Sequence, residues 1–280
     1  MIDECFELIS LIFRLFPYDF FNGHKESETA YQQKLNTHFA TFSTHAAVQF
    51  AANNPLGYDA IGHYAMHLRK ENDRFALLPD LSCLYKDERW TPDRAAAFLP
   101  LVNDFYRDTA FADFFAAHTD YYNEETQKFH AAQYGKIDFP WLEKYTHGKK
   151  LHVIFSPSLS NCNYGSAAGN DVYAIVPHNS AVVHEFCHSF GNPLAEKWYT
   201  QRAEFREMCD NSVDAKRLPW YANGPTMARE YVTRAYHVLY DMQHGEANLK
   251  ARLTIERNWH TRNSFPHIAQ VYEMVCASNS

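Results

Sequence analysis

The chain has 280 residues, of which 46% are hydrophobic, 16% aromatic and 21% charged. This composition supports a buried core in one large domain or two smaller ones, and it excludes wholesale disorder. The formal net charge of −7 argues against nucleic acid and anionic membrane surfaces as partners, because both reward clustered Lys and Arg.

The first half of the chain has the periodicity of helices. Residues 2–16 carry apolar side chains at helical spacing, interrupted by Glu7 and Arg14, which predicts an amphipathic helix and neither a signal peptide nor a membrane span. Further helices are predicted over residues 30–52, 91–106 and 111–122. In the second of them Thr91 is the expected N-cap, and Pro92 stands at the first helical position. We interpret these segments as scaffold.

One pair of histidines in this helical part, His63 and His67, is spaced one helical turn apart. No Glu follows His63 in the sequence, so the pair lacks the pattern of a hydrolytic metal site. We therefore interpret both as packing or surface residues.

A short β-rich region follows. Residues 151–155 and 171–176 are β-branched or apolar runs that predict two strands, separated by a Ser-, Asn- and Gly-rich loop or hairpin connection over residues 158–170. The strand 172–176 is either an ordinary structural strand or an open edge to which an extended peptide adds. Asn179 and Ser180 predict the N-cap of the next helix.

After Gly191-Asn192-Pro193 the chain is predicted to be helical again, over residues 194–209, 226–243, 247–259 and 266–276.

The predicted helix after the strands carries the motif His184-Glu185-Phe186-Cys187-His188. His184 and His188 are one turn apart on one helical face, so both imidazoles can reach one zinc ion. Glu185 points beside the metal, where it can act as the general base. Two strands leading into such a helix are the expected context for this motif.

A catalytic zinc takes a third protein ligand and keeps one position open. Leu194 stands where a metzincin would have its third His, so that arrangement fails and a later Glu is required. The candidates are Glu196, Glu204, Glu207, Glu230 and Glu246. We predict Glu230, because it lies among aromatic and small residues that should be buried, and a buried carboxylate needs a partner. Arg234, one turn later, could orient it or simply pair with it.

The six cysteines are scattered and form no CxxC pair, which excludes a Cys-rich zinc ribbon and a thioredoxin-like redox pair. Cys187 is predicted to pack inward, away from the histidine face. Cys162, in a predicted loop, is the better nucleophile candidate, but the sequence shows no base for it.

The stretch 184–194, together with Arg229-Glu230-Tyr231 and Arg234-Ala235-Tyr236, resembles a family of bacterial proteins, the domain-of-unknown-function family DUF4932, which is similar to the gluzincin metallopeptidases. The segment 45–48 and the strand into Ser156-Pro157-Ser158-Leu159 share the resemblance, so it covers most of the chain. Cys187 and Gly191 depart from the family pattern. The resemblance implies His184, His188 and Glu230 as ligands of Zn²⁺ and Glu185 as the base.

The resemblance also implies a mostly helical α+β fold, in which a helical N-terminal part (1–148) precedes a zincin-like catalytic part (149–280) with a small β-sheet; a single continuous unit is the alternative. It further implies export to the periplasm, surface or medium, although this chain begins with no signal peptide. In gluzincins a His or Tyr stabilises the oxyanion. Here His237 lies on roughly the same helical face as Glu230, and Tyr221 and Tyr236 are rivals.

The sequence therefore predicts a zinc metallopeptidase with Glu185 and His237 as catalytic residues, acting on a peptide or protein substrate. The alternatives are a zinc amidase or esterase acting on a non-peptide substrate, and a zinc-bearing binding protein without turnover. Retention of Glu185 argues against the last alternative, because a structural zinc needs no adjacent base.

Overall fold

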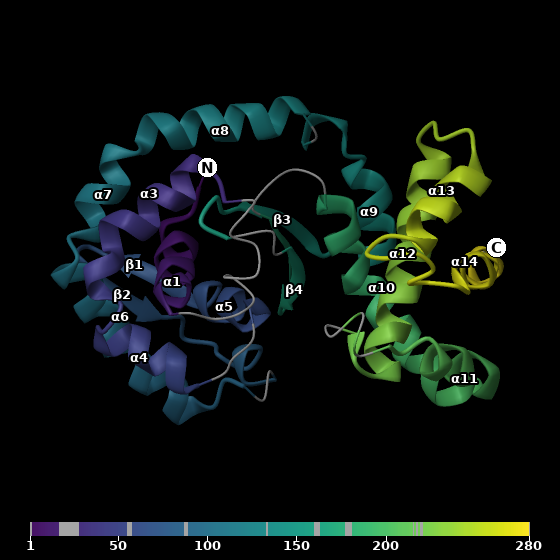
Figure 1. The fold of residues 1–280 in the computed structure, drawn as a ribbon, viewed down its shortest axis with the longest axis horizontal. Helices are drawn as coiled ribbons and strands as arrows, with labels where there is room; N and C mark the ends of the chain where they lie inside the picture. Colours follow the sequence, from purple (N-terminus) through teal and green to yellow (C-terminus); the bar gives the residue numbers. More distant parts are fainter. Residues whose placement is uncertain are drawn as a thin grey trace. The chain divides into compact units, whose positions relative to one another are not determined.

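The computed structural model describes residues 2–16, 28–54, 58–86, 89–132, 134–159, 163–176, 181–214, 216, 218 and 221–279. Across these residues helices predominate over two small sheets, which confirms the expected mostly helical α+β class (Figure 1). None of the helices in the described ranges has the length and apolar character needed to cross a membrane.

The chain divides into two compact units. Unit 1 is Met1–Asp138 with Lys150–Val182, and unit 2 is Phe139–Lys149 with Val183–Ser280. This division differs from the boundary expected after residue 148, because the three-stranded sheet groups with the N-terminal residues and not with the motif helix.

Unit 1 is built around α1 (Glu4–Leu15), which Asp3 caps by accepting hydrogen bonds from two backbone amides. The prediction of a one-sided amphipathic helix understates its burial, since every residue from Cys5 to Arg14 is buried. The reason is tertiary: α3, α4, α5 and β1 all pack against this helix. The remaining elements of unit 1 are α3 (Ala30–Phe39), η2 (Ala40–Phe42), α4 (Ala46–Asn53), α5 (Tyr58–Ala65), β1 (Leu68–Glu71), β2 (Arg74–Leu77), η3 (Leu84–Lys86), α6 (Pro92–Asp108), α7 (Phe111–Ala117), α8 (Thr119–Ala132), η4 (Tyr134–Lys136), β3 (Lys150–Phe155), β4 (Tyr164–Ala168) and β5 (Asp171–Val176).

Two of the predicted N-terminal helices are divided in the structure. The segment 30–52 breaks at η2, after which the His45 side chain caps α4. The segment 111–122 divides at His118 into α7 and α8. The start of α6 is as predicted, with the Thr91 side chain accepting a hydrogen bond from the Arg94 amide.

The three-stranded sheet has the order β3-β5-β4, with β3 parallel and β4 antiparallel to β5. β3 and β5 are the two predicted strands, whereas β4 lies in the segment predicted as a loop or hairpin connection. Because β4 pairs with β5, the central strand has neighbours on both sides. Of the two alternatives for residues 172–176, the structure therefore shows the ordinary structural strand and not the open edge. Gly62 of α5 allows Tyr164 of β4 to pack closely, since a Cβ there would lie 2.2 Å from the tyrosine hydroxyl.

Unit 2 is helical. Its elements are α9 (Phe139–Thr146), α10 (Val182–Gln201, whose first residue belongs to unit 1), α11 (Ala203–Asn211), α12 (Gly224–Gln243), α13 (Leu249–Arg257) and α14 (Ile268–Ser278). The core of the unit joins Cys187 and Trp198 of α10 to Tyr231 of α12 and Val271 of α14.

The expected break at Gly191-Asn192-Pro193 does not occur, because α10 continues through Pro193 to Gln201. A proline inside a helix costs about 3 kcal/mol. Ala195 and Trp198, beyond it, are buried in the unit 2 core, and this packing offsets the cost. The predicted N-cap at Asn179-Ser180 lies outside the described residues.

Candidate metal centre

Two imidazoles on α10 form one side of the candidate site. His184 and His188 lie one turn apart, and their ring centroids are 4.9 Å apart with perpendicular planes. Burial, followed by the neighbouring His188, lowers the pKa of His184 well below its usual 6.5. The ring is therefore neutral at physiological pH, as a metal ligand must be.

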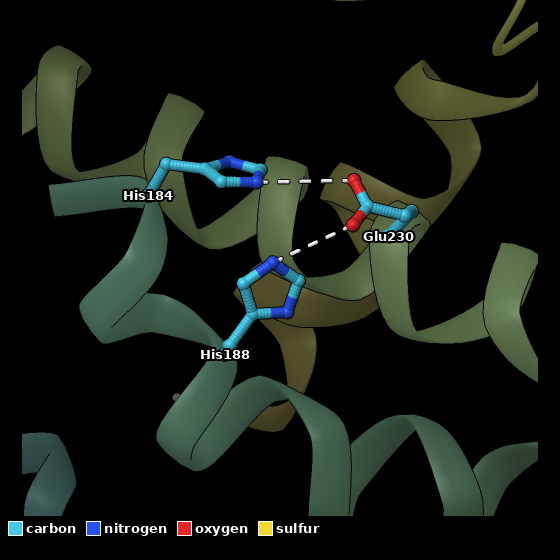
Figure 2. A group of neighbouring side chains, drawn as sticks. All are labelled: His184, His188 and Glu230. Carbon is cyan, nitrogen blue, oxygen red and sulfur yellow. Dashed lines mark ion pairs between the residues drawn. The ribbon is translucent and has the colours of Figure 1, made fainter. Parts of the chain in front are cut away.

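Glu230 of α12 forms the other side. Its Oε1 lies 3.4 Å from His188 Nε2, and its Oε2 lies 3.8 Å from His184 Nε2. Figure 2 shows each imidazole edge directed at one oxygen of this carboxylate. The predicted third ligand therefore converges on the two histidines.

This donor set fits a divalent cation. One ligand atom from each residue lies within 4.8 Å of the other two, and within the described residues this is the one such group of three or more His, Cys, Asp or Glu side chains. Ligand atoms around a tetrahedral zinc are about 3.4 Å apart. In addition, Glu230 Oε2 is buried and makes no hydrogen bond within the described part of the chain, so an acceptor is left for a cation.

A glycine allows the two helices to come close enough for this arrangement. A Cβ on Gly191 of α10 would lie 3.1 Å from Thr233 Oγ1 and 3.4 Å from Thr233 Cα of α12. Gly191 is one turn from His188, and Thr233 is one turn from Glu230. The close approach therefore occurs next to the ligands themselves.

The orientation of His188 is set by its second nitrogen. Nδ1 lies 3.0 Å from Asn192 Oδ1 and 3.1 Å from Thr233 Oγ1. An amide oxygen can only accept, so Nδ1 carries the proton and donates it. The Nε2 lone pair is consequently directed toward Glu230 and the place where a cation would lie.

Glu185 is close to the centre but is not one of the three converging ligands. Its side chain is buried, and its Oε2 lies 3.9 Å from His188 Nε2. The Glu185 carboxylate thus lies beside the three converging side chains.

A chain of buried ion pairs extends from Glu230. Arg234 Nη2 lies 3.2 Å from Glu230 Oε2, and Arg234 Nη1 lies 2.6 Å from Glu256 Oε2. Arg252 pairs with Glu256 at 2.7 Å and also with Asp241 at 2.5 Å. Arg234 is thus a partner of Glu230, as expected, but it also has a second carboxylate partner.

The three candidate oxyanion donors have different surroundings. The His237 ring lies 5.8 Å from the His184 ring, and its Nε2 lies 3.9 Å from Asp241. The Tyr221 hydroxyl lies 3.1 Å from His260 Nε2; burial, followed by the charge of Glu230, raises its pKa. Tyr236 packs in the core against Tyr145 and Phe190, so the structure does not bring it to the centre.

The other sequence candidates lie elsewhere. Cys187 is fully buried in the unit 2 core, which confirms its inward packing, and Cys162 lies outside the described residues. The rejected carboxylates Glu196, Glu204, Glu207 and Glu246 are exposed. In unit 1, His67 Nδ1 bonds the His63 carbonyl and His63 Nε2 bonds Ser166, in keeping with packing roles.

Sequence reasoning missed Asn192, Thr233 and Glu256. Asn192 lies four residues after His188, but this spacing became informative only once the structure showed that α10 continues past Gly191. Thr233 meets His188 and Glu256 meets Arg234 only through contacts between helices, so no local pattern identified them.

The sequence matches no family model, and comparisons with curated proteins and with solved structures find no similar protein. The resemblance to DUF4932 and the gluzincins therefore stays a prediction from the motifs.

Proposed function

We propose that this protein is a zinc-dependent metallopeptidase, with His184, His188 and Glu230 as zinc ligands and Glu185 as general base. The observation that carries the proposal is the convergence of Glu230 of α12 on the two imidazoles of α10. Two His and one Glu form the donor set of several catalytic zinc sites.

The donor set supports catalysis more than a structural role. Structural zinc sites take four protein ligands, whereas three leave a position for water and substrate. The side chains of His184, His188 and Glu230 retain exposed fractions of 14%, 17% and 11%, so solvent can reach the centre. When bound, zinc would lower the pKa of a water molecule and polarise the substrate carbonyl.

Glu185 supplies proton transfer. It follows His184 on α10 and lies beside the ligands, where its carboxylate takes the proton of the attacking water and passes it to the leaving amine.

For the oxyanion we propose His237, whose ring is near His184. Burial lowers its pKa, so at neutral pH it donates as a neutral imidazole. Tyr221 is the alternative, supported by its place beside Glu230 and its bond to His260. His237→Gln and Tyr221→Phe separate them: loss of the true donor should lower kcat by about 100-fold or more, with zinc content unchanged.

The test of the proposal combines metal analysis with peptide cleavage. Purified wild type should contain one zinc per chain and cleave members of a peptide library, and chelation should abolish cleavage. Glu185→Gln should retain zinc but lose about 100- to 10,000-fold in kcat. Glu204→Gln, an exposed carboxylate on α11, is the matched control and should remain active.

Two outcomes favour the alternatives. Cleavage of amide or ester substrates but of no peptide would indicate a non-peptide hydrolase with the same centre. Zinc binding with no turnover on either substrate class would indicate a zinc-bearing binding protein, and the hydrolase proposal would be wrong.

A further inference from the structure

Arg234 presents a problem for the proposed ligand Glu230. The two residues are one turn apart on α12, the spacing at which Glu and Arg form an ion pair. The Arg234 side chain is only 3% exposed, so water screens its charge little and the charge acts strongly on neighbouring groups. A guanidinium that closed fully on Glu230 would occupy the carboxylate and repel a divalent cation.

The contacts of Arg234 show that it does not close on Glu230. Its short contact, 2.6 Å, goes to Glu256, whereas the contact with Glu230 is 3.2 Å. The longer contact is an ion pair without hydrogen-bond geometry, since Glu230 Oε2 has no hydrogen-bond partner within the described ranges. Of its two carboxylate partners, Arg234 therefore donates a hydrogen bond to Glu256 and not to Glu230.

Glu256 is itself buried, paired with a second arginine and charged. Its side chain is 1% exposed, and its Oε1 lies 2.7 Å from Arg252 Nη1. Although burial alone would raise it, the charges of Arg234 and Arg252 hold the pKa of Glu256 below its usual value. Arg252 in turn is held by Asp241 at 2.5 Å. Glu256 thus presents a buried negative charge to Arg234.

Two aromatic rings restrict the guanidinium further. The Arg234 Cζ atom lies 4.4 Å from the Phe265 ring centroid and 5.3 Å from that of Trp259. Contacts of this kind favour a cation over a ring and limit its movement. The rings and Glu256 together limit the movement of Arg234 toward Glu230.

We propose that Glu256 is a positioning residue, which holds the Arg234 guanidinium off Glu230 so that the Glu230 carboxylate remains available to a divalent cation. This inference rests on the proposed metal centre but not on the substrate. Glu256 acts in two ways: it competes for the guanidinium, and its charge offsets that of Arg234 near the cation.

The test is zinc titration of metal-free protein, competed against a chromophoric chelator. Glu256→Gln leaves Arg234 with Glu230 as its main partner, so zinc affinity should fall by about 10- to 100-fold. Glu256→Asp, which shortens the reach to Arg234, should lose affinity by a smaller factor and provides a second variant if the first does not fold.

The double variant Arg234→Met, Glu256→Gln is decisive. If Glu256 serves to restrain Arg234, removing Arg234 removes the need for it, and the double variant should bind zinc more tightly than Glu256→Gln alone. A merely structural role predicts that the double variant binds as weakly or more weakly, and that result would overturn the proposal. The absorption of bound Co²⁺ should follow the same order, since it reports the ligand set without any turnover.

The control is the ion pair of Arg14 and Glu28 in unit 1, which is also 2.6 Å long and largely buried. Glu28→Gln should lower the thermal stability of unit 1 but leave zinc affinity unchanged. Absence of zinc binding in wild type would remove the proposed centre and this inference together. Normal binding in wild type with equal affinity in Glu256→Gln would overturn the inference alone.

Discussion

Glu7 in unit 1 and Glu230 in unit 2 are both buried carboxylates, but their partners differ. In unit 1, Glu7 is 1% exposed and accepts hydrogen bonds from Ser156 Oγ, Ser158 Oγ and Tyr31 Oη. In unit 2, Glu230 faces two imidazoles and an arginine, yet its Oε2 accepts no hydrogen bond within the part of the chain described.

The difference separates a carboxylate whose hydrogen bonds hold the fold together from one that the fold leaves available. Both oxygens of Glu7 have neutral donors, so its polar capacity is used by the fold, and it ties α1 to the loop after β3. Glu230 retains unused acceptor capacity among groups that a cation would bring together. Burial alone identifies neither role; the partners do.

The largest expected effect comes from making the same substitution at both carboxylates. Glu230→Gln removes a ligand and should weaken zinc binding by more than the roughly 100-fold that loss of a supporting partner costs. Glu7→Gln should leave zinc affinity unchanged. Isothermal titration of both variants with zinc measures this difference. Equal losses of zinc affinity would contradict the assignment of Glu230, and not Glu7, as a zinc ligand.

Zinc binding should also stabilise unit 2 against local unfolding without stabilising unit 1. A ligand at 100 times its Kd stabilises the state that binds it by about 2.7 kcal/mol. Hydrogen exchange should therefore slow in α10 and α12 on zinc addition, while the amides of α1 exchange as before. Equal protection of both units would place the zinc effect outside the proposed centre.

A smaller effect is expected from the residue that orients His188. Asn192→Ala removes one of the two acceptors at His188 Nδ1, and zinc affinity should fall about tenfold, because Thr233 remains. Asn103 of α6, whose side chain bonds both backbone groups of Phe75, is the matched amide in unit 1. Asn103→Ala should destabilise unit 1 without changing zinc affinity.

The smallest expected effect is the pH response of unit 1. Burial raises the pKa of Glu7 above its usual 4.5, despite the hydrogen bonds to it that oppose this. The folded state therefore holds a proton more tightly than the unfolded chain. The stability from this proton is complete below pH 4.5 and is lost as pH rises through the raised pKa, with a slope of at most about 1.4 kcal/mol per pH unit.

Glu7→Gln cannot titrate, so it isolates this contribution. The unfolding free energy of wild type minus that of the variant should decrease as pH rises from 4 toward 8, measured by denaturant titration. A difference that stays constant or increases with pH would contradict the assignment of Glu7 as a carboxyl group whose proton the fold retains.

The sequence alone determined the features that depend on local spacing. His184 and His188 share one face of α10 because they are four residues apart, and Thr91 caps α6 because its hydroxyl reaches an amide within the same turn. The sequence also singled out Glu230 as the candidate third ligand, because a carboxylate among apolar residues of one helix requires a partner.

The tertiary structure decided what depends on packing between distant segments. The pairing of β4 with β5, the continuation of α10 through Pro193 and the division into two units all follow from contacts that no local pattern specifies. The same holds for the close approach of Gly191 to Thr233 and for the pairing of Arg234 with Glu256. The physical reason is that helical periodicity fixes which face a side chain occupies, whereas burial and charge pairing across the core fix which residue it meets.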